Sequence, residues 1–467
     1  MQADGVAPLR DLMSRLDLSA EDLDAYRPTL LNRPAFADLH RLESAVQDVE
    51  QLLNLMADMP VRLFDGDVDR YLQSLGVEAD ERACILRGSA GRLLPYGRVD
   101  TVTDADGGYR ILEVNATSNL FGIDSGHINR ALLRDPEFEK FYREFDLDYV
   151  DTTTKVAELL TEVAPATPGA EPVIALVEGR GGVSANGPIL AAIAASLELH
   201  GLRVVLGELN DLREVNGKLH LECHGPIDVL VRYFENDQLL AASPDLELLD
   251  MIMRADRRGT TTFFTSLDAC LHDSKALLGL LHSHRGRAVM QDKERRLVDR
   301  LVPWTKLLGR DLKYVEEHER RKVLERCMDE QDDLVLKPGL AFGGRDVKFG
   351  SDVSKESWSQ LIKYGASTDL VVQERADGLP EPVLNFDTGE VEDWRANWGL
   401  FITGRGFSGG YMRALQPIQG LVINHTNPAT RSTCLFTTPR DTIDSPAAPP
   451  GRGVPRAWPP DVRPHGS

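Results

Sequence analysis

The sequence predicts an α/β (α+β) protein of several lobes, and three observations carry that prediction. Apolar residues at helical spacing end near residue 90 and give way to short segments rich in β-formers. A strand–helix–strand pattern then occupies residues 172–240, and short strands return after residue 334. A chain of 467 residues, 42% hydrophobic and 27% charged, can bury a large core.

Residues 1–90 are predicted to form an N-terminal helical region. The segment RLESAVQDVEQLLNLMADM (41–59) repeats apolar residues at the spacing of one helix face. The first residues are acidic and amphipathic and do not resemble a secretory leader. The apolar positions of the helix are Leu42, Val46, Val49, Leu52 and Leu53.

Residues 151–265 are predicted to form a βαβ lobe on a parallel sheet. Strands are expected at 172–178, 202–209 and 226–234, with a helix over 188–201 closed by Gly201. The first strand runs into Gly179, Gly181 and Gly182, a group that resembles a phosphate-binding turn. The group is not a G-x-G-x-x-G and we expect no helix directly after it, so a loop at the sheet edge is the preferred interpretation.

The remaining chain is predicted to contain two further parts. Residues 266–436 begin with helices and continue with strands at 334–338, 343–350 and 369–377, and with a helix around 354–365. Residues 437–467 are dense in Pro, Gly, Ser and charge, a composition that cannot form a core, so we expect a disordered tail.

Composition excludes several classes of protein. A net charge of −20 argues against a nucleic-acid-binding surface. No apolar run is long enough to predict a membrane span. Five widely spaced cysteines without a C-x-x-C pair predict neither a disulfide framework nor a structural zinc site. We therefore expect a cytoplasmic protein with reduced thiols, while its oligomeric state stays open.

The segment 91–150 opens with the most informative motif, a hairpin formed by 97–104 and 107–116. Pairing about a centre near Asp106 places Asp100 opposite Glu113 and Arg98 opposite Asn115. Because side chains alternate between faces along a strand, this register puts all four on one face.

That set of side chains suits a magnesium–phosphate site. Magnesium prefers hard oxygen ligands, usually one or two carboxylates completed by phosphate and water, and Asp100, Glu113 and Asn115 supply such oxygens. Arg98 supplies a planar donor for a neighbouring phosphate. A solvated face with cross-strand charge pairs is the alternative.

Two later motifs are weaker taken singly. LKPGLAFGGRDV (336–347) places Lys337 at a strand end before a loop with Gly343 and Gly344, which suits phosphate contact, although it is not a Walker A motif. DLVVQERAD (369–377) ends in Gln373 and Glu374, which can line an adenine and ribose pocket. Taken alone, the first motif is explained equally well as a Gly-rich turn, and the second as an ordinary polar strand end.

In order, these motifs resemble the circularly permuted ATP-grasp ligases, of which the glutathionylspermidine-synthase-like enzymes are the best-known branch. The series runs R-x-D, E-x-N, a helical lysine, K-P with a Gly-rich loop, V-V-Q-E and G-G-x-x-R, between about residues 90 and 436. In ordinary ATP-grasp proteins the lysines precede E-x-N, whereas here Glu113 and Asn115 come first. The resemblance implies an ATP-grasp fold in permuted order with a βαβ substrate lobe resembling a pre-ATP-grasp domain.

The resemblance also implies a role for each matching residue. Asp100, Glu113 and Asn115 resemble the magnesium ligands. Arg98 resembles the arginine on the γ-phosphate and acyl-phosphate, and Arg413 a further phosphate or carboxylate arginine. The implied nucleotide-binding residues are Lys275, Lys337, Gly343, Gly344, Gln373 and Glu374.

Two assignments are less direct. Lys293 and Lys306 compete with Lys275 as the first nucleotide lysine. Arg232 is similar to an arginine near the substrate cleft of the family and is expected to pair with a substrate carboxylate. The loop reads GGRDV rather than Gly-Arg-Glu-Gly, and the chain carries no amidase domain, so glutathione and spermidine are not implied as substrates.

The implied activity is ATP-dependent joining of a small carboxylate to an amine, such as an amino acid or peptide, through an acyl-phosphate. ATP and Mg²⁺ are the expected cofactors. Three alternatives stay open: a small-molecule kinase using the same site, a non-catalytic nucleotide-binding protein, and a dinucleotide oxidoreductase built on residues 172–206. The last lacks the full glycine fingerprint.

Overall fold

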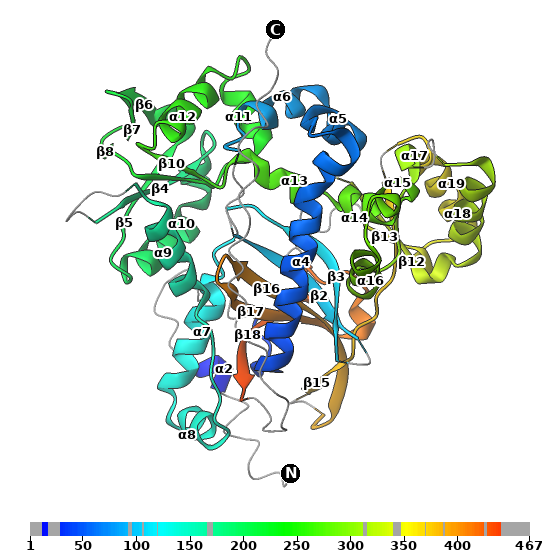
Figure 1. Cartoon of the computed structure of the whole chain (residues 1–467). Helices are drawn as coiled ribbons and strands as arrows, with labels where there is room; N and C mark the ends of the chain where they lie inside the picture. Colours follow the sequence, from blue (N-terminus) through cyan, green and yellow to red (C-terminus); the bar gives the residue numbers. More distant parts are fainter. Residues whose placement is uncertain are drawn as a thin grey trace.

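The structure is a computed structural model of the chain. It describes residues 12–16, 29–91, 96–104, 107–118, 120–165, 171–311, 315–339, 347–368, 370–385, 388–424 and 427–439. Three main sheets are arranged around a long helix that crosses the middle of the molecule (Figure 1). The mixed α/β class predicted from the sequence is confirmed.

A seven-stranded central sheet forms the body of the molecule, in the order β1-β18-β17-β16-β2-β3 with β15 paired to β16. All its pairings are antiparallel except that of β1 with β18, which brings the two ends of the described chain together. The strands are β1 (Ala35–Asp38), β2 (Tyr96–Thr103), β3 (Tyr109–Asn115), β15 (Glu381–Leu384), β16 (Val391–Thr403), β17 (Gly406–Leu415) and β18 (Arg431–Thr438).

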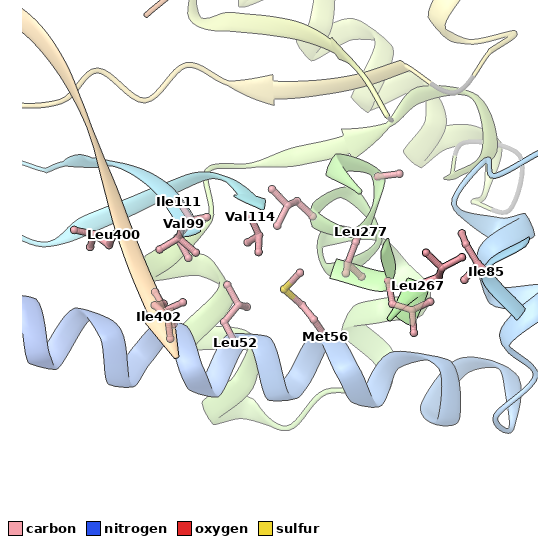
Figure 2. Packing of buried hydrophobic residues seen from close by; sticks show 14 of the residues in the cluster. Leu52, Met56, Ile85, Val99, Ile111, Val114, Leu267, Leu277, Leu400 and Ile402 are labelled. Carbon is pink, nitrogen blue, oxygen red and sulfur yellow. The ribbon is translucent and has the colours of Figure 1, made fainter. Parts of the chain in front are cut away.

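Helix α4 (Leu39–Phe64) confirms the predicted N-terminal helix and packs under the central sheet. Asp38 caps it by accepting a hydrogen bond from the Arg41 backbone N–H. In Figure 2, Leu52 and Met56 of this helix point toward Val99 and Val114 of the hairpin. The same cluster includes Ile111, Leu400, Ile402 and Leu277, so one apolar core joins the helix, the sheet and the later helices.

A second, parallel sheet in the order β10-β9-β4-β5 confirms the predicted βαβ unit. Its carboxyl edge faces the loop after β3, where the Ser118 hydroxyl donates to the Arg232 carbonyl. The elements are β4 (Val173–Glu178), α10 (Gly182–Glu198), β5 (Arg203–Glu208), β9 (Val229–Arg232) and β10 (Thr262–Phe264). A small antiparallel sheet, β6 (Leu212–Val215), β7 (Lys218–Leu221) and β8 (Gly225–Pro226), is inserted before β9.

A third, antiparallel sheet in the order β11-β14-β12-β13 has a core of its own. Trp358 lies at the centre of this core and donates from its indole N–H to the Cys327 carbonyl at 2.6 Å. The elements are β11 (Thr305–Leu307), β12 (Leu334–Pro338), β13 (Lys348–Phe349), β14 (Leu370–Glu374), α18 (Glu317–Asp329) and α19 (Lys355–Gly365). In Figure 1 this lobe lies on the opposite side of α4 from the parallel sheet.

The remaining helices cover these sheets. They are α2 (Leu12–Arg15), α5 (Val68–Ser74), α6 (Ala79–Arg87), α7 (Ile123–Arg134), α8 (Pro136–Glu144), α9 (Thr152–Val163), α11 (Asn236–Ala242), α12 (Glu247–Arg257), α13 (Cys270–Asp273), α14 (Lys275–His282), α15 (His284–Ala288), α16 (Asp292–Leu301) and α17 (Leu308–Asp311). Among the described helices, none is both long and apolar enough to cross a bilayer. All five cysteines are free thiols, as predicted.

Three sequence predictions need correction. The N-terminal region contains strand β1, which a local reading misses because its partner lies 400 residues away at Leu435. Helix α10 starts at Gly182, the last residue of the glycine group, and carries Pro188 inside it. The expected tail at 437–467 overlaps β18, which extends to Thr438; residues 440–467 lie outside the described part.

The central core predicts a clear difference between neighbouring positions of α4. Leu52 is fully buried and Gln51 is exposed. We expect Leu52→Ala to lower the free energy of unfolding by about 2–5 kcal/mol, because it removes packed methyl groups and leaves a cavity. Urea denaturation followed by circular dichroism measures the change. Gln51→Ala is the matched control, and equal effects of the two substitutions would contradict this account of the core.

Candidate active site

A cavity of about 680 Å³ lies between the central sheet and the β11-β14-β12-β13 sheet. Strands β2, β3, β16 and β17 form one wall, and β12, β14 and the first residue of α14 form the other. Nine of the residues singled out from the sequence line it: Arg98, Asp100, Glu113, Asn115, Lys275, Lys337, Gln373, Glu374 and Arg413. Residues that are up to 315 positions apart in the chain thus meet at one site.

At the positions whose side chains line the cavity, β2 and β3 pair in the register predicted from the sequence. Arg98 lies opposite Asn115, and Asp100 lies opposite Glu113. Toward the turn the register shifts by one, because Thr101 pairs with Ile111 and leaves an extra residue on β3. This bulge lets both Leu112 and Glu113 line the cavity.

Arg98 and Asp100 form an ion pair with two hydrogen bonds on the wall of the cavity that the central sheet provides. The guanidinium Nε and Nη2 donate to the two carboxylate oxygens at 2.6 and 3.0 Å. Burial opposes the charge of Arg98, but Asp100 and the nearby Tyr411 and Glu113 outweigh it and raise the pKa of the guanidinium. A cation is therefore held at this half-buried point of the cavity wall.

Two lysines converge on Glu113 from the opposite wall. The Lys275 ammonium lies 3.0 Å from the Glu113 carboxylate. Burial alone would raise the pKa of Glu113, but Lys275 and Lys337 overcome it and lower that pKa to about 2. Lys337 donates to the Gln373 side-chain oxygen at 2.6 Å, and burial lowers the pKa of its ammonium to about 8.

The oxygen-bearing side chains fit a magnesium ion that shares its coordination with a ligand. Asp100, Glu113 and Asn115 lie on one face, which supplies two carboxylates and one amide oxygen. Within the described residues no group of three or more His, Cys, Asp and Glu is arranged to hold a metal alone. Magnesium in proteins usually completes its coordination with phosphate oxygens and water.

The other end of the cavity is apolar and ends at the exit of strand β14. The buried Gln373 amide donates to the Thr305 hydroxyl at 3.1 Å, and the Glu374 carboxylate lies 3.3 Å from Arg326. Apolar side chains from both walls enclose this end: Val102, Leu112, Val335, Phe349 and Trp394. This arrangement suits a flat ring, which would lie between the two apolar walls with the polar end of β14 beside it.

The three lysines that compete for the role of first nucleotide lysine lie in different places in the structure. Lys275 lines the cavity, whereas Lys306 donates to the His282 carbonyl and Lys293 lies on α16, neither lining it. Gly343 and Gly344 lie outside the described residues.

Arg232 is not among the described residues that line the cavity. It is 2% exposed, its Nε donates to the Thr265 carbonyl at 3.2 Å, and its Nη2 has no hydrogen-bond partner among the described residues. Its pairing with a substrate carboxylate stays a prediction.

Several residues of the site were missed by the sequence reasoning. Glu235 and Thr117 line the end of the cavity nearest the parallel sheet. Arg395 and Asn397 of β16 line the wall that the central sheet provides. Arg395 and Asn397 occupy the same strand face as Gly399, opposite Asp100, so a predicted pairing of β16 with β2 would have found them. No local motif marks them.

Asp273 is a further residue that the sequence did not indicate. It is buried two residues before Lys275, and its carboxylate accepts a hydrogen bond from the backbone N–H of Ala116, the residue after Asn115. Burial raises the pKa of this carboxyl to about 7. The contact ties the end of α13 to the residue that follows β3.

Comparison with known proteins bears on the fold. No family model matches the chain, and no curated protein matches its sequence. Among solved structures, the chain is similar to a glutathione synthetase-like effector (GSS30) from Globodera pallida in its apo form. That similarity has a TM-score of 0.56 at 14% identity, and it covers 88% of this chain and 90% of the effector.

A second solved structure, a putative gamma-glutamylcysteine synthetase from Methylobacillus flagellatus KT, aligns at a TM-score of 0.35 and 14% identity over 91% of this chain and 93% of that one. A TM-score of this size does not indicate a shared fold. The first similarity shows a fold shared with a glutathione synthetase-like protein along most of both chains.

The buried Asp273 predicts a pH dependence of stability. Its pKa in the folded protein lies above the ordinary aspartate pKa of 3.8, so the folded state keeps a proton that the unfolded state releases. Stability should therefore fall as pH rises from about 4 to about 7, by roughly 4 kcal/mol, and level off above. Asp273→Asn keeps an acceptor for Ala116 and should remove this loss. Urea unfolding of both proteins across this pH range measures it, and parallel curves would contradict the assignment.

Proposed function

We propose that this protein is an ATP-dependent carboxylate–amine ligase, ADP-forming, that works through an acyl-phosphate. The single observation that supports the proposal most is the convergence of Arg98, Asp100, Glu113, Lys275 and Lys337 on one cavity. The likeness to a glutathione synthetase-like fold agrees with it. The order of the motifs along the chain is the basis for proposing an ATP-grasp fold in circularly permuted order.

In the proposed reaction, ATP lies between the two sheets. Its adenine occupies the apolar end near Gln373 and Glu374, and its phosphates lie toward Lys275 and Lys337. Asp100, Glu113 and Asn115 hold Mg²⁺, which neutralises charge on the phosphates when it is bound. Positioning and electrostatic stabilisation by these side chains supply most of the catalysis, because phosphoryl transfer needs little covalent help from a protein.

The substrate carboxylate attacks the γ-phosphorus of ATP and ADP departs. Arg98 and Arg413 stabilise the acyl-phosphate, since a guanidinium donates two parallel hydrogen bonds to phosphate oxygens. The amine then attacks the acyl carbon, and phosphate leaves. The cavity lies between two walls, which limits access of water to the intermediate. We place the substrates at the end next to the parallel sheet, where Thr117 and Glu235 line the cavity.

Two substitutions test the proposed site. Glu113→Gln and Arg98→Ala should each lower turnover by about two or more decades, because they remove a metal ligand and the arginine on the transferred phosphoryl group. ADP release in steady state measures turnover, and circular dichroism checks the fold. Glu390→Gln and Arg143→Ala, at exposed positions outside the cavity, are the matched controls. Normal turnover of either site variant would refute its assigned role.

Trapping with hydroxylamine tests the reaction type. The protein is incubated with Mg-ATP and a pool of amino acids and small carboxylic acids, and hydroxamates are sought by mass spectrometry. We expect a hydroxamate that requires both ATP and Glu113, and its mass names the carboxylate substrate. ADP without hydroxamate, together with a phosphorylated small molecule, would replace the ligase with a kinase. Tight ATP binding without ADP would indicate a non-catalytic nucleotide-binding protein.

A further inference from the structure

Tyr411 lies between the two cavity arginines. Its ring centroid is 5.4 Å from the guanidinium carbon of Arg98 and 4.6 Å from that of Arg413. Both distances fall within the range of a cation–π contact. The strand register explains the arrangement, because Tyr411 pairs with Gly399, which pairs with Asp100. Tyr411, Gly399 and Asp100 thus form a row across the sheet. Arg413 lies two residues along β17 from Tyr411, on one side of this row, and Arg98 lies two residues along β2 from Asp100, on the other side.

The ring can take this place only because its cross-strand neighbour is glycine. A Cβ at position 399 would lie 2.5–2.8 Å from three atoms of the Tyr411 side chain. With no side chain on Gly399, the ring lies flat over β16 and reaches toward β2. The Phe401 ring supports it edge-on, with centroids 6.1 Å apart. The position of the ring is thus determined by the sheet itself.

The phenol group contributes its ring rather than its hydroxyl. Tyr411 is buried, and its hydroxyl has no hydrogen-bond partner among the described residues. Burial raises its pKa to about 12, so it is neutral at ordinary pH. Both arginines line the cavity, whereas Tyr411 is not among the described residues that do. The ring therefore supports the two guanidinium groups from behind.

An aromatic support has an advantage over an acidic one. Arg98 has Asp100 as its ion-pair partner, but Asp100 is also a proposed magnesium ligand and cannot serve both fully. A carboxylate beside each arginine would cancel the positive charge that an anionic ligand needs. The face of a ring stabilises a guanidinium through its quadrupole and carries no net charge. Two like charges can thus be kept near each other while both stay available to the ligand.

We propose that Tyr411 is a positioning residue, which holds Arg98 and Arg413 at the spacing that one phosphoryl or acyl-phosphate group requires. This inference rests on the proposed function and extends it to a residue that touches neither substrate nor metal.

The first test needs no substrate. Phenylglyoxal modifies accessible arginines, and peptide mass spectrometry gives the modification rate of Arg413 in the wild type and in three variants. Tyr411→Leu removes the ring while keeping apolar volume, and Gly399→Ala displaces the ring, so both should accelerate modification several-fold. Tyr411→Phe keeps the ring and should match the wild type. A rate unchanged in Tyr411→Leu, or a Tyr411→Phe rate equal to that of Tyr411→Leu, would overturn the proposal.

The second test is a double-mutant cycle in turnover. Tyr411→Leu should lower kcat by about 10- to 100-fold, the size expected for two desolvated cation–π contacts, and leave KM for ATP nearly unchanged. In an Arg413→Ala background the same substitution should cost much less, because one of the two groups through which the ring acts is gone. Equal losses in both backgrounds would show a merely structural role and sink the inference.

The two proposals fail in different ways. A wild type that forms neither ADP nor hydroxamate refutes the ligase, and the Arg413 modification rates then decide by themselves whether the ring holds the arginine. A wild type that is active while Tyr411→Leu is equally active refutes only the role of Tyr411.

Discussion

The cross-strand pairing of β2 with β3 is the constraint on which the site depends. It places Asp100 opposite Glu113 and Arg98 opposite Asn115, and the opposite wall presents Lys275 of α14 and Lys337 of β12 to that face. A slip of one residue would turn the whole set toward the core under the sheet, where α4 packs. The bulge near the turn absorbs the irregularity of the loop without disturbing these two pairs.

Two ion pairs within the site balance part of its charge. Arg98 is paired with Asp100 and Lys275 with Glu113, whereas Lys337 donates to the neutral side chain of Gln373. In the proposed reaction, binding of a metal–phosphate complex would exchange the two internal pairs for contacts with the ligand, so neither member of a pair would be left buried without a partner.

Local features of the sequence predicted much of this, and long-range ones did not. The hairpin register follows from a short turn, and the βαβ unit from its spacing, so both were correct in advance. Strand β1 was missed because four residues carry little signal and their partner is distant. Helix α10 begins at Gly182 rather than at residue 188, and Pro188 lies inside it, a position where proline is ordinarily unfavourable. Tyr411 has no motif, since its role arises from which strands become neighbours.

The parallel pairing of β1 with β18 has a consequence for how the protein folds. Strands β4, β5 and β9 are complete within residues 173–232, so their sheet can form while the chain is still being made. The central sheet is different, since Ala35 must wait for Leu435 before its edge is closed. Contacts of this sequence separation slow folding, and until they form the apolar face of α4 has an incomplete cover. Until β16, β17 and β18 have been synthesised, the nascent chain therefore exposes apolar surface that the folded protein buries.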